Sequence, residues 1–275
     1  MPNLSPPRLS LNQNCTPGWS VEQDVEAAVR CGVPGISVHR RKVEPVGVAP
    51  VRRLLRDAGL EVPSYLATGR FLFPGERERR IEECKQHIEA AAQLEAGCLV
   101  MLTGPQGQMT WDEANAEFLR SLEVVLPLAA EHRLKIALEP VTAAVPDHSY
   151  LHLLGDALDV VRQVNSPWFG LAVDLWYCWW ERRLEEQLRE AGKKVFIVQV
   201  ADHNPDSPSM YDRAMLGEGI LPLPRLLREV RESGYTGWYD IEVLSTRFTP
   251  QDRERLLPQC VAGFDVAWRA SSSGA

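Results

Sequence analysis

The feature that most constrains the fold is a regular alternation of short apolar segments with longer segments of helical pattern along the whole chain. The short segments are mostly apolar and of strand length, as expected for buried parallel strands. There are eight of them: Arg8–Asn14, Gly35–His39, Glu61–Leu66, Cys98–Thr103, Leu134–Glu139, Phe169–Asp174, Val195–Val200 and Trp238–Val243. Eight strands alternating with helices predict an α/β fold, the (β/α)8 TIM barrel.

The boundaries between these segments carry the residues expected at helix ends. Capping boxes from Ser20 to Gln23 and from Thr110 to Glu113 mark two helix starts, and Thr249 followed by proline marks a third. A glycine that could adopt a left-handed conformation follows a helical segment at five places: Gly32, Gly59, Gly97, Gly192 and Gly234. This repeated order of helix, glycine and strand argues against a helical solenoid or an all-β sandwich.

Length and composition agree with one barrel. Residues 1–275 are predicted to form a single TIM-barrel domain, with 270–275 a disordered polar tail. No apolar run is long enough to span a bilayer, so no membrane contact is expected. The first residues lack the basic and apolar pattern of a secretory signal, which leaves the cytoplasm as the expected location.

Charge and cysteine content exclude other classes of partner. The net charge is −7, and the longest basic stretch is the four-residue patch that begins at His39, so no nucleic-acid-binding surface is expected. The six cysteines include no C-x-x-C pair, which argues against a zinc knuckle and a disulfide framework.

Three of the predicted strands end in a carboxylate. Glu139, Asp174 and Glu242 close the fifth, sixth and eighth strands, whose C-terminal ends form the mouth of a TIM barrel. Ala137 and Ala172 lie two residues before the first two acids, on the same face, and leave room for an ion or a substrate. Three converging acids must be protonated, paired with cations or bound to a metal.

A divalent metal is the simplest of these solutions, and pairing with Arg or Lys is the alternative. Oxygen ligands favour Mn²⁺ or Mg²⁺ over zinc, although Co²⁺ could be accepted. On the seventh strand, the two-residue period places Gln199 on the face shared with Ile197, so Gln199 is the candidate fourth ligand. His203, four residues further on, could reach the metal or the substrate from the loop, or be solvated.

Four segments together resemble the sugar phosphate isomerase/epimerase superfamily, the xylose isomerase-like barrels that include ketose 3-epimerases, inosose isomerases and dehydratases, and endonuclease IV. The resemblance covers nearly the whole chain. It is carried by LSLNQNCTPGWSVEQDVEAAVRCGVPGIS, ALEP, VDLWYCWWE and RAMLGEGILPLPRLLREVRESGYTGWYDIEV. It implies a divalent metal bound by Glu139, Asp174, a strand-seven histidine and Glu242, with Gln199 at the position of that histidine.

Other positions also depart from the family pattern. Tyr177 stands where the sixth-strand motif D-x-x-H has its histidine, Thr142 replaces a frequent histidine after ALEP, and His39 stands where close relatives tend to have an aromatic residue. Loss of an imidazole should weaken the affinity for zinc or cobalt and favour harder ions. Tyr177 titrates near pH 10 and cannot take over a histidine's proton transfer at neutral pH.

The resemblance implies an isomerase or epimerase that moves a proton at a carbon next to the carbonyl of a small polyhydroxylated substrate, a sugar or cyclitol. Glu139 and Glu242 would remove and return the proton. Arg213 would hold a substrate oxygen or carboxylate, with a surface loop arginine as the alternative. Four further residues lie at or just beyond strand ends and are predicted to bind substrate: Tyr177, His39, His203 and Trp176.

Two other functions stay open. A lyase or dehydratase would use the same chemistry to expel a β-hydroxyl, and a barrel that has lost its chemistry would serve as a binding subunit. The missing histidines motivate the second alternative. Endonuclease chemistry is disfavoured because a multi-histidine zinc cluster and a basic surface are missing. The sequence leaves the substrate and the oligomeric state open, a homodimer being one option.

Overall fold

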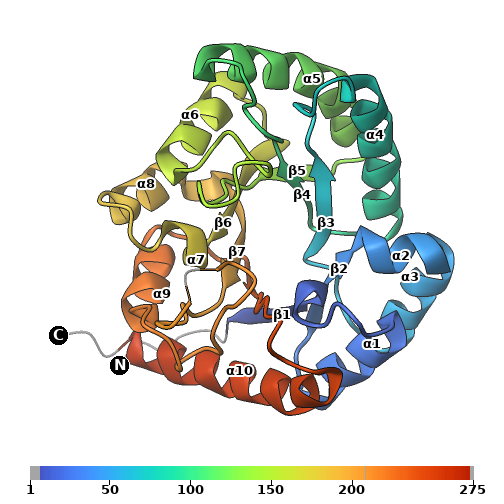
Figure 1. Ribbon diagram of the computed structural model, residues 1–275. Helices are drawn as coiled ribbons and strands as arrows, with labels where there is room; N and C mark the ends of the chain where they lie inside the picture. Colours follow the sequence, from blue (N-terminus) through green and yellow to red (C-terminus); the bar gives the residue numbers. More distant parts are fainter. Residues whose placement is uncertain (1–6, 208, 273–275) are drawn as a thin grey trace.

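The computed structural model describes residues 7–207 and 209–272. Their eight strands are all parallel and close a barrel in chain order, which confirms the predicted (β/α)8 fold. Figure 1 shows the strands at the centre and the helices around them. The strands are β1 (Arg8–Asn12), β2 (Gly35–His39), β3 (Ser64–Gly69), β4 (Cys98–Leu102), β5 (Lys135–Leu138), β6 (Phe169–Asp174), β7 (Val195–Val200) and β8 (Trp238–Ile241).

The helices bury their apolar faces against the outside of the barrel. They are α1 (Val21–Arg30), α2 (Arg40–Val46), α3 (Val48–Asp57), α4 (Arg77–Gln93), α5 (Trp111–Glu131), α6 (Leu154–Val164), α7 (Leu175–Cys178), α8 (Leu184–Ala191), α9 (Leu223–Glu232) and α10 (Pro250–Ala270). Two short 3-10 turns, η1 (Gln13–Cys15) and η2 (Gly192–Lys194), precede α1 and β7. Within the described ranges, none of these helices is long and apolar enough to cross a membrane.

The predicted strands agree with the observed ones except at some ends. The second, sixth and seventh have the predicted bounds, and four others are shorter by one or two residues at an end. The third was placed too early, at Glu61 instead of Ser64. Glu61 forms only an isolated bridge with Gly35, and Pro63 has no N–H group to continue a ladder, so the regular strand starts after it.

The predicted helix starts are confirmed. Ser20, Thr110 and Thr249 each accept a hydrogen bond from the third residue of the helix, and that residue's side chain bonds back to the backbone N–H of the cap. These reciprocal bonds satisfy backbone donors that a helix start would leave unpaired.

Four of the five glycines predicted to follow helices have a positive φ, namely Gly32, Gly59, Gly192 and Gly234. The prediction for Gly97 is wrong, because Glu95 adopts the left-handed conformation after α4, with φ 57°. Gly97 is needed for a different reason: a Cβ there would lie 2.8 Å from the carbonyl oxygen of Pro63. The close approach of two backbones, not helix termination, explains this glycine.

The barrel interior below the mouth has an apolar side and a polar side. The apolar side comes from β3 to β7 and contains Leu66, Cys98, Val100, Ala137, Ala172 and Ile197. On the polar side, Asp240 of β8 accepts hydrogen bonds from Ser10 at 2.5 Å and Asn12 at 2.7 Å, and burial raises its pKa to about 6. Side chains therefore fill the barrel beneath the mouth, as in other barrels of this class.

The predicted disordered tail overlaps the end of the last helix. Helix α10 continues to Ala270, and Ser271 is fully buried. Arg231 donates hydrogen bonds to the hydroxyl and the carbonyl oxygen of Ser271, each at 3.0 Å. These bonds fix the end of the helix, so the prediction is wrong for residues 270–272, and residues 273–275 lie outside the described ranges.

Candidate active site

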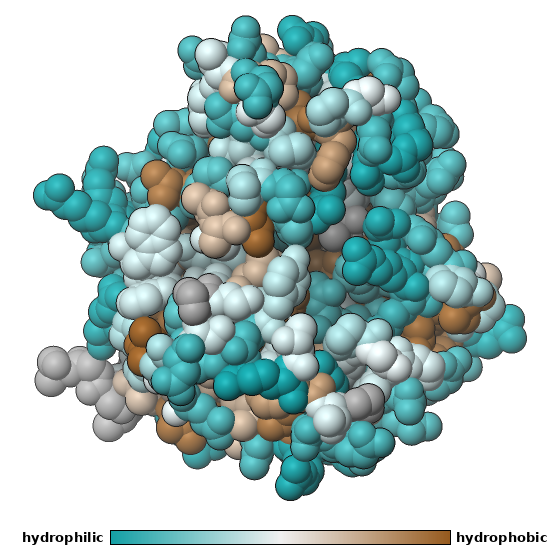
Figure 2. Space-filling view, in the orientation of Figure 1, coloured by the Kyte–Doolittle hydropathy of each residue, from teal (hydrophilic) through white to brown (hydrophobic). Residues whose placement is uncertain are grey.

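A cavity opens among the C-terminal ends of the strands. Its empty volume, including the open mouth, is about 990 Å³. Figure 2 shows the surface recessed near the middle of the view, where most of the surrounding residues are hydrophilic. Glu139, Tyr177, Arg213, Glu242 and His39 lie in its wall, together with several arginines from the opposite side. Concave sites with converging polar groups at this end of a barrel are the usual location of catalysis.

The three predicted carboxylates meet at this wall, with Glu139 and Glu242 lining the cavity and Asp174 buried beside them. Glu139, Asp174 and Glu242 each offer an oxygen within 4.8 Å of the others, and none is more than 9% exposed. Asp174 is the last residue of β6, and the two glutamates directly follow β5 and β8. Their backbone N–H groups bond to the neighbouring strands, Glu139 to Met101 and Glu242 to Val200, so the barrel itself fixes the positions of these acids.

Arg213 provides a buried positive charge beside these carboxylates. Its Nη2 lies 2.9 Å from Oδ2 of Asp174, and its Nη1 lies 3.4 Å from Oε2 of Glu242. The guanidinium also lies 5.1 Å from the ring centroids of Trp176 and Tyr177. Burial alone would lower the pKa of Arg213, but the neighbouring carboxylates, led by Asp174, raise it on balance. The arginine therefore stays charged.

Asp202 anchors the loop that follows Arg213. Its carboxylate accepts hydrogen bonds from the backbone N–H groups of Gly217, Gly219 and Leu221 at 2.9 to 3.1 Å. A Cβ at Gly219 would lie 2.3 Å from the carboxylate, so only glycine fits there. On the other side, the Arg213 N–H donates to the carbonyl oxygen of Leu244 at 2.8 Å. The loop is thus tied to β7 and β8, which directs Arg213 into the site.

The three acids differ in their hydrogen bonds. Glu242 accepts from Asn14 at 2.9 Å and from the Gln199 amide at 3.2 Å. Asp174 accepts from the backbone N–H of Trp176 at 2.9 Å through Oδ1. The carboxylate of Glu139 accepts no hydrogen bond from any described residue. Glu242 and Asp174 are held in place, whereas Glu139 faces the cavity without a donor.

Burial and mutual repulsion make these acids hard to ionise together. Burial raises the pKa of Glu139 well above its ordinary value, and Glu242 and Asp174 raise it further. Burial likewise raises the pKa of Glu242 to about 8, although Arg213 opposes the shift. If all three carboxylates were ionised, the single guanidinium would leave two negative charges uncompensated. A divalent cation would balance them.

Two buried oxygens point to the same conclusion. Oδ2 of Asp174 and Oε1 of Gln199 accept no hydrogen bond, although both are out of contact with solvent. The contact of Arg213 with Oδ2 is an ion pair without an aligned hydrogen bond. Buried acceptors without donors are rare and call for an explanation. These oxygens and the two glutamates form a set that fits Mn²⁺ or Mg²⁺, which prefer carboxylate and carbonyl ligands.

The remaining predicted residues divide into two groups. Tyr177 and His39 line the cavity with Arg213, and the Tyr177 hydroxyl donates to the sulfur of Met210 at 3.7 Å. Trp176 and His203 are not among its lining residues and stack on each other, with ring centroids 5.0 Å apart. Trp176 therefore contacts the site through Arg213, and His203 supports Trp176 from the side away from the cavity.

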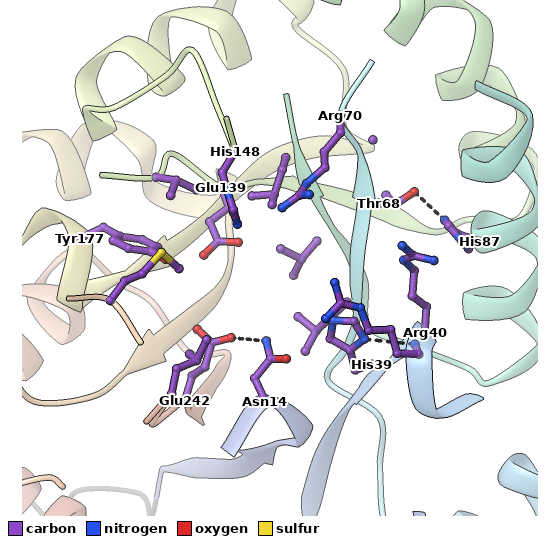
Figure 3. Close-up of a pocket in the computed structure, with 18 of the residues that line it drawn as sticks. Asn14, His39, Arg40, Thr68, Arg70, His87, Glu139, His148, Tyr177 and Glu242 are labelled. Atoms are coloured by element: carbon purple, nitrogen blue, oxygen red, sulfur yellow. Dashed lines mark hydrogen bonds between the residues drawn. The ribbon is translucent and has the colours of Figure 1, made fainter. Parts of the chain in front are cut away.

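Three further residues of the wall carry no strong sequence signal. Asn14, which holds Glu242, is 228 residues away in the chain and closes the first predicted strand. His148 lies in the long segment between β5 and α6, 17% exposed, beside Asp147 and Tyr211. Arg70 follows β3 and points into the cavity (Figure 3). Position at or just beyond a strand end was the signal available for Asn14 and Arg70, whereas His148 had none.

The comparison with protein families agrees with the fold. The profile of the xylose isomerase-like TIM barrel family matches residues 25–260. The chain therefore belongs to the xylose isomerase-like TIM barrel family.

The similar proteins include sugar epimerases. L-Ribulose-5-phosphate 3-epimerase UlaE of Salmonella paratyphi A is 24% identical over 198 residues, or 69% of this chain, and the match spans 66% of its own length. The structure of protein SMc04130 from Sinorhizobium meliloti 1021 has 26% identity and a TM-score of 0.89, covering 94% of this chain and 98% of that one. The IOLI protein, solved with a zinc atom, shares the fold, with a TM-score of 0.80, 19% identity and coverage of 97% and 98%.

Proposed function

We propose that this protein is a divalent-metal-dependent isomerase or epimerase that transfers a proton at a carbon next to the carbonyl of a sugar- or cyclitol-like substrate. The observation that carries the proposal is the unbalanced site, in which three buried carboxylates within 4.8 Å of one another share a single guanidinium. The curated relative, an L-ribulose-5-phosphate 3-epimerase, supports a ketose as the substrate class.

Glu139, Asp174, Gln199 and Glu242 would hold Mn²⁺ or Mg²⁺. When bound, the ion would help to stabilise the negative charge that develops on the substrate's carbonyl oxygen. Arg213 contributes to the same end, because its Nη2 has no aligned hydrogen-bond partner and can donate to a substrate oxygen. Tyr177, in the same wall, narrows the cavity beside Arg213.

The two glutamates can exchange protons with the substrate. Glu139 faces the cavity without a donor, so nothing in the protein competes for its carboxylate. Glu242 projects from another strand, and burial brings its pKa to about 8, close to the pH at which it must both accept and release a proton. Two such groups on different strands can remove a proton on one side of a carbon and return it on the other, or to the neighbouring carbon.

Proton exchange with solvent tests this function. The protein would be incubated with Mn²⁺ and a panel of ketoses and inososes in D₂O, with NMR following the hydrogen next to the carbonyl and mass spectrometry following the product. We expect metal-dependent exchange, lost with a chelator, and a product of unchanged mass apart from deuterium.

The same experiment separates the alternatives. A product that has lost one water would replace the isomerase by a lyase. Less than about a tenth of an ion per chain after Mn²⁺ is supplied, with no exchange for any substrate, would favour a binding subunit.

A further inference from the structure

The wall of the cavity opposite the carboxylates is basic. Figure 3 shows Glu139 and Glu242 on one side, and Arg70, His39 and Arg40 on the other. The basic side comes from the ends of β2 and β3 and the starts of α2 and α4, and its arginines are Arg40, Arg41, Arg70 and Arg80. The cavity therefore has carboxylates on one side and arginines on the other.

Two of these arginines have carboxylate partners and two do not. Arg40 pairs with Glu44 at 3.1 Å, and Arg80 pairs with Glu76 at 2.8 Å. For Arg41 and Arg70, the described part of the chain offers no ion pair and no side-chain hydrogen bond. Two guanidinium groups in one wall are therefore free to bind an anion, and Arg pairs readily with phosphate and carboxylate oxygens.

Arg70 is directed into the cavity by an unusual backbone. Its φ is 59°, in the left-handed region that bulky residues rarely adopt. Its N–H donates to the carbonyl oxygen of Leu102 at 2.7 Å, and a Cβ at Gly104 would lie 3.1 Å from the Arg70 backbone. The end of β4 thus holds this turn in place. Costly conformations of this kind persist where the surroundings fix them, and they concentrate at functional positions.

His39 adds a neutral donor to the same wall. Its Nδ1 accepts a hydrogen bond from the Arg41 N–H at 3.1 Å, which leaves the ring hydrogen on Nε2. Burial, together with the positive charges of Arg41, Arg40, Lys42 and Arg70, lowers the pKa of His39 to about 3. The histidine is neutral at physiological pH, yet it still offers an N–H group to an oxygen in the cavity.

We propose that this wall binds an anionic group, a phosphate or a carboxylate, carried by the substrate at the end away from the reacting carbon, with Arg70 and Arg41 as its main ligands. This inference rests on the proposed function, because the carboxylate side of the same cavity would hold the reacting end. It restricts the substrate class from sugars in general to sugar phosphates or sugar acids.

Binding measurements test the anion site separately from the reaction. Calorimetry at fixed ionic strength would compare L-ribulose 5-phosphate, D-fructuronate, neutral L-ribulose and inorganic phosphate, with the wild type and the variants R70Q, R70K and R41Q. The variant R53Q, on the exposed surface of α3, is the matched control for the loss of one positive charge.

We expect at least one anionic ketose to bind to the wild type at least about tenfold more tightly than L-ribulose. R70Q and R41Q should reduce this preference, and R70K should keep part of it. A stronger preference for L-ribulose 5-phosphate assigns a phosphate, and one for D-fructuronate assigns a carboxylate. R41Q repeats the test without disturbing the packed turn at Arg70. Equal affinity for neutral and anionic ketoses, or the same loss in R53Q as in R70Q and R41Q, would overturn the proposal.

The two proposals fail in different ways. Binding of the anionic ketose without exchange of the hydrogen next to its carbonyl would leave the anion site in place and refute the proton transfer. Metal-dependent exchange that is equally fast with neutral ketoses, and unchanged in R70Q, would leave the reaction in place and refute the anion site.

Discussion

Two of the places where the chain buries carboxylates are built differently. In α1, Asp24 accepts hydrogen bonds from Lys42 at 2.6 Å, Thr16 at 2.6 Å and Gln13 at 2.9 Å. One acid meets one cation there, and both carboxylate oxygens have donors. At the mouth, three acids share Arg213, and buried oxygens are left without donors.

The difference separates a structural ion pair from a binding site. A buried pair whose charges balance and whose hydrogen bonds are complete needs nothing else to be stable. A buried cluster with surplus charge and unpaired oxygens is unfavourable by itself and becomes favourable when a ligand binds. The unpaired oxygens and the surplus of acids over cations at the mouth, more than the presence of acids, are the reason for proposing it as the functional site. Each of the following variants tests that distinction.

The largest effect is expected for E139Q. The amide cannot take up a proton, so the rate of exchange next to the carbonyl should fall by about 10²- to 10⁴-fold. The thermal midpoint of the metal-free protein should stay the same or rise, because the variant removes a buried acid whose ionisation is unfavourable beside Glu242 and Asp174. Exchange followed by NMR, together with thermal unfolding, measures both. A variant that keeps wild-type exchange would exclude Glu139 from the proton transfer.

The variant K42M breaks the balanced pair. Removing the cation leaves Asp24 buried without a counter-charge and should lower the free energy of unfolding by about 3–5 kcal/mol near pH 7.5. Burial already raises the pKa of Asp24 from its ordinary 3.8 to about 6, and the loss of Lys42 raises it further.

The loss in K42M should therefore depend on pH. In the folded variant Asp24 stays neutral up to its raised pKa, which lies above about 6, whereas in the unfolded chain it ionises above its ordinary 3.8. Stability should fall as the pH rises through this window. Urea denaturation at pH 5 and pH 7.5 measures it, with the double variant D24N/K42M as the uncharged control. An equal loss at both pH values would contradict the assignment.

The variant R213M removes the cation from the unbalanced cluster. We expect it to lower the stability of the metal-free protein, as in K42M, but Mn²⁺ should restore about 2.7 kcal/mol at a concentration one hundred times its dissociation constant. Urea denaturation with and without Mn²⁺ measures the recovery. K42M keeps the carboxylate cluster intact, so Mn²⁺ should stabilise K42M and the wild type by equal amounts. No stabilisation by Mn²⁺ in any of these three proteins would refute the metal site at the mouth.

The smallest effect is expected for Q199H. An imidazole in place of the amide oxygen should strengthen binding of Zn²⁺ on the order of tenfold and change binding of Mg²⁺ little. Competition with a chromogenic chelator measures both affinities. Unchanged affinity for both ions would show that residue 199 is not a metal ligand. The Gln199 amide, which donates a hydrogen bond to Glu242, would then have only a structural role.

Strand residues at the site could be predicted because the side chains of a strand alternate between two faces. That period, with the position of each acid at a strand end, was enough to bring Glu139, Asp174 and Glu242 together and to turn Gln199 inward. The same reasoning recovered β2, β6 and β7 to the residue. It failed at β3, where Pro63 delays the ladder and the pairing shifts register before Thr68.

The side chains of loop residues do not alternate in this way, so their positions could not be predicted from a period. The sequence alone determined the closed barrel and the acids at its mouth. The tertiary structure decided that Arg213 enters the carboxylate cluster, that Asn14 supports Glu242 and that Arg70 faces them across the cavity. The physical reason is that a strand's periodicity is local, whereas these loops are fixed by hydrogen bonds to distant residues, such as those of Asp202 to the loop after Arg213.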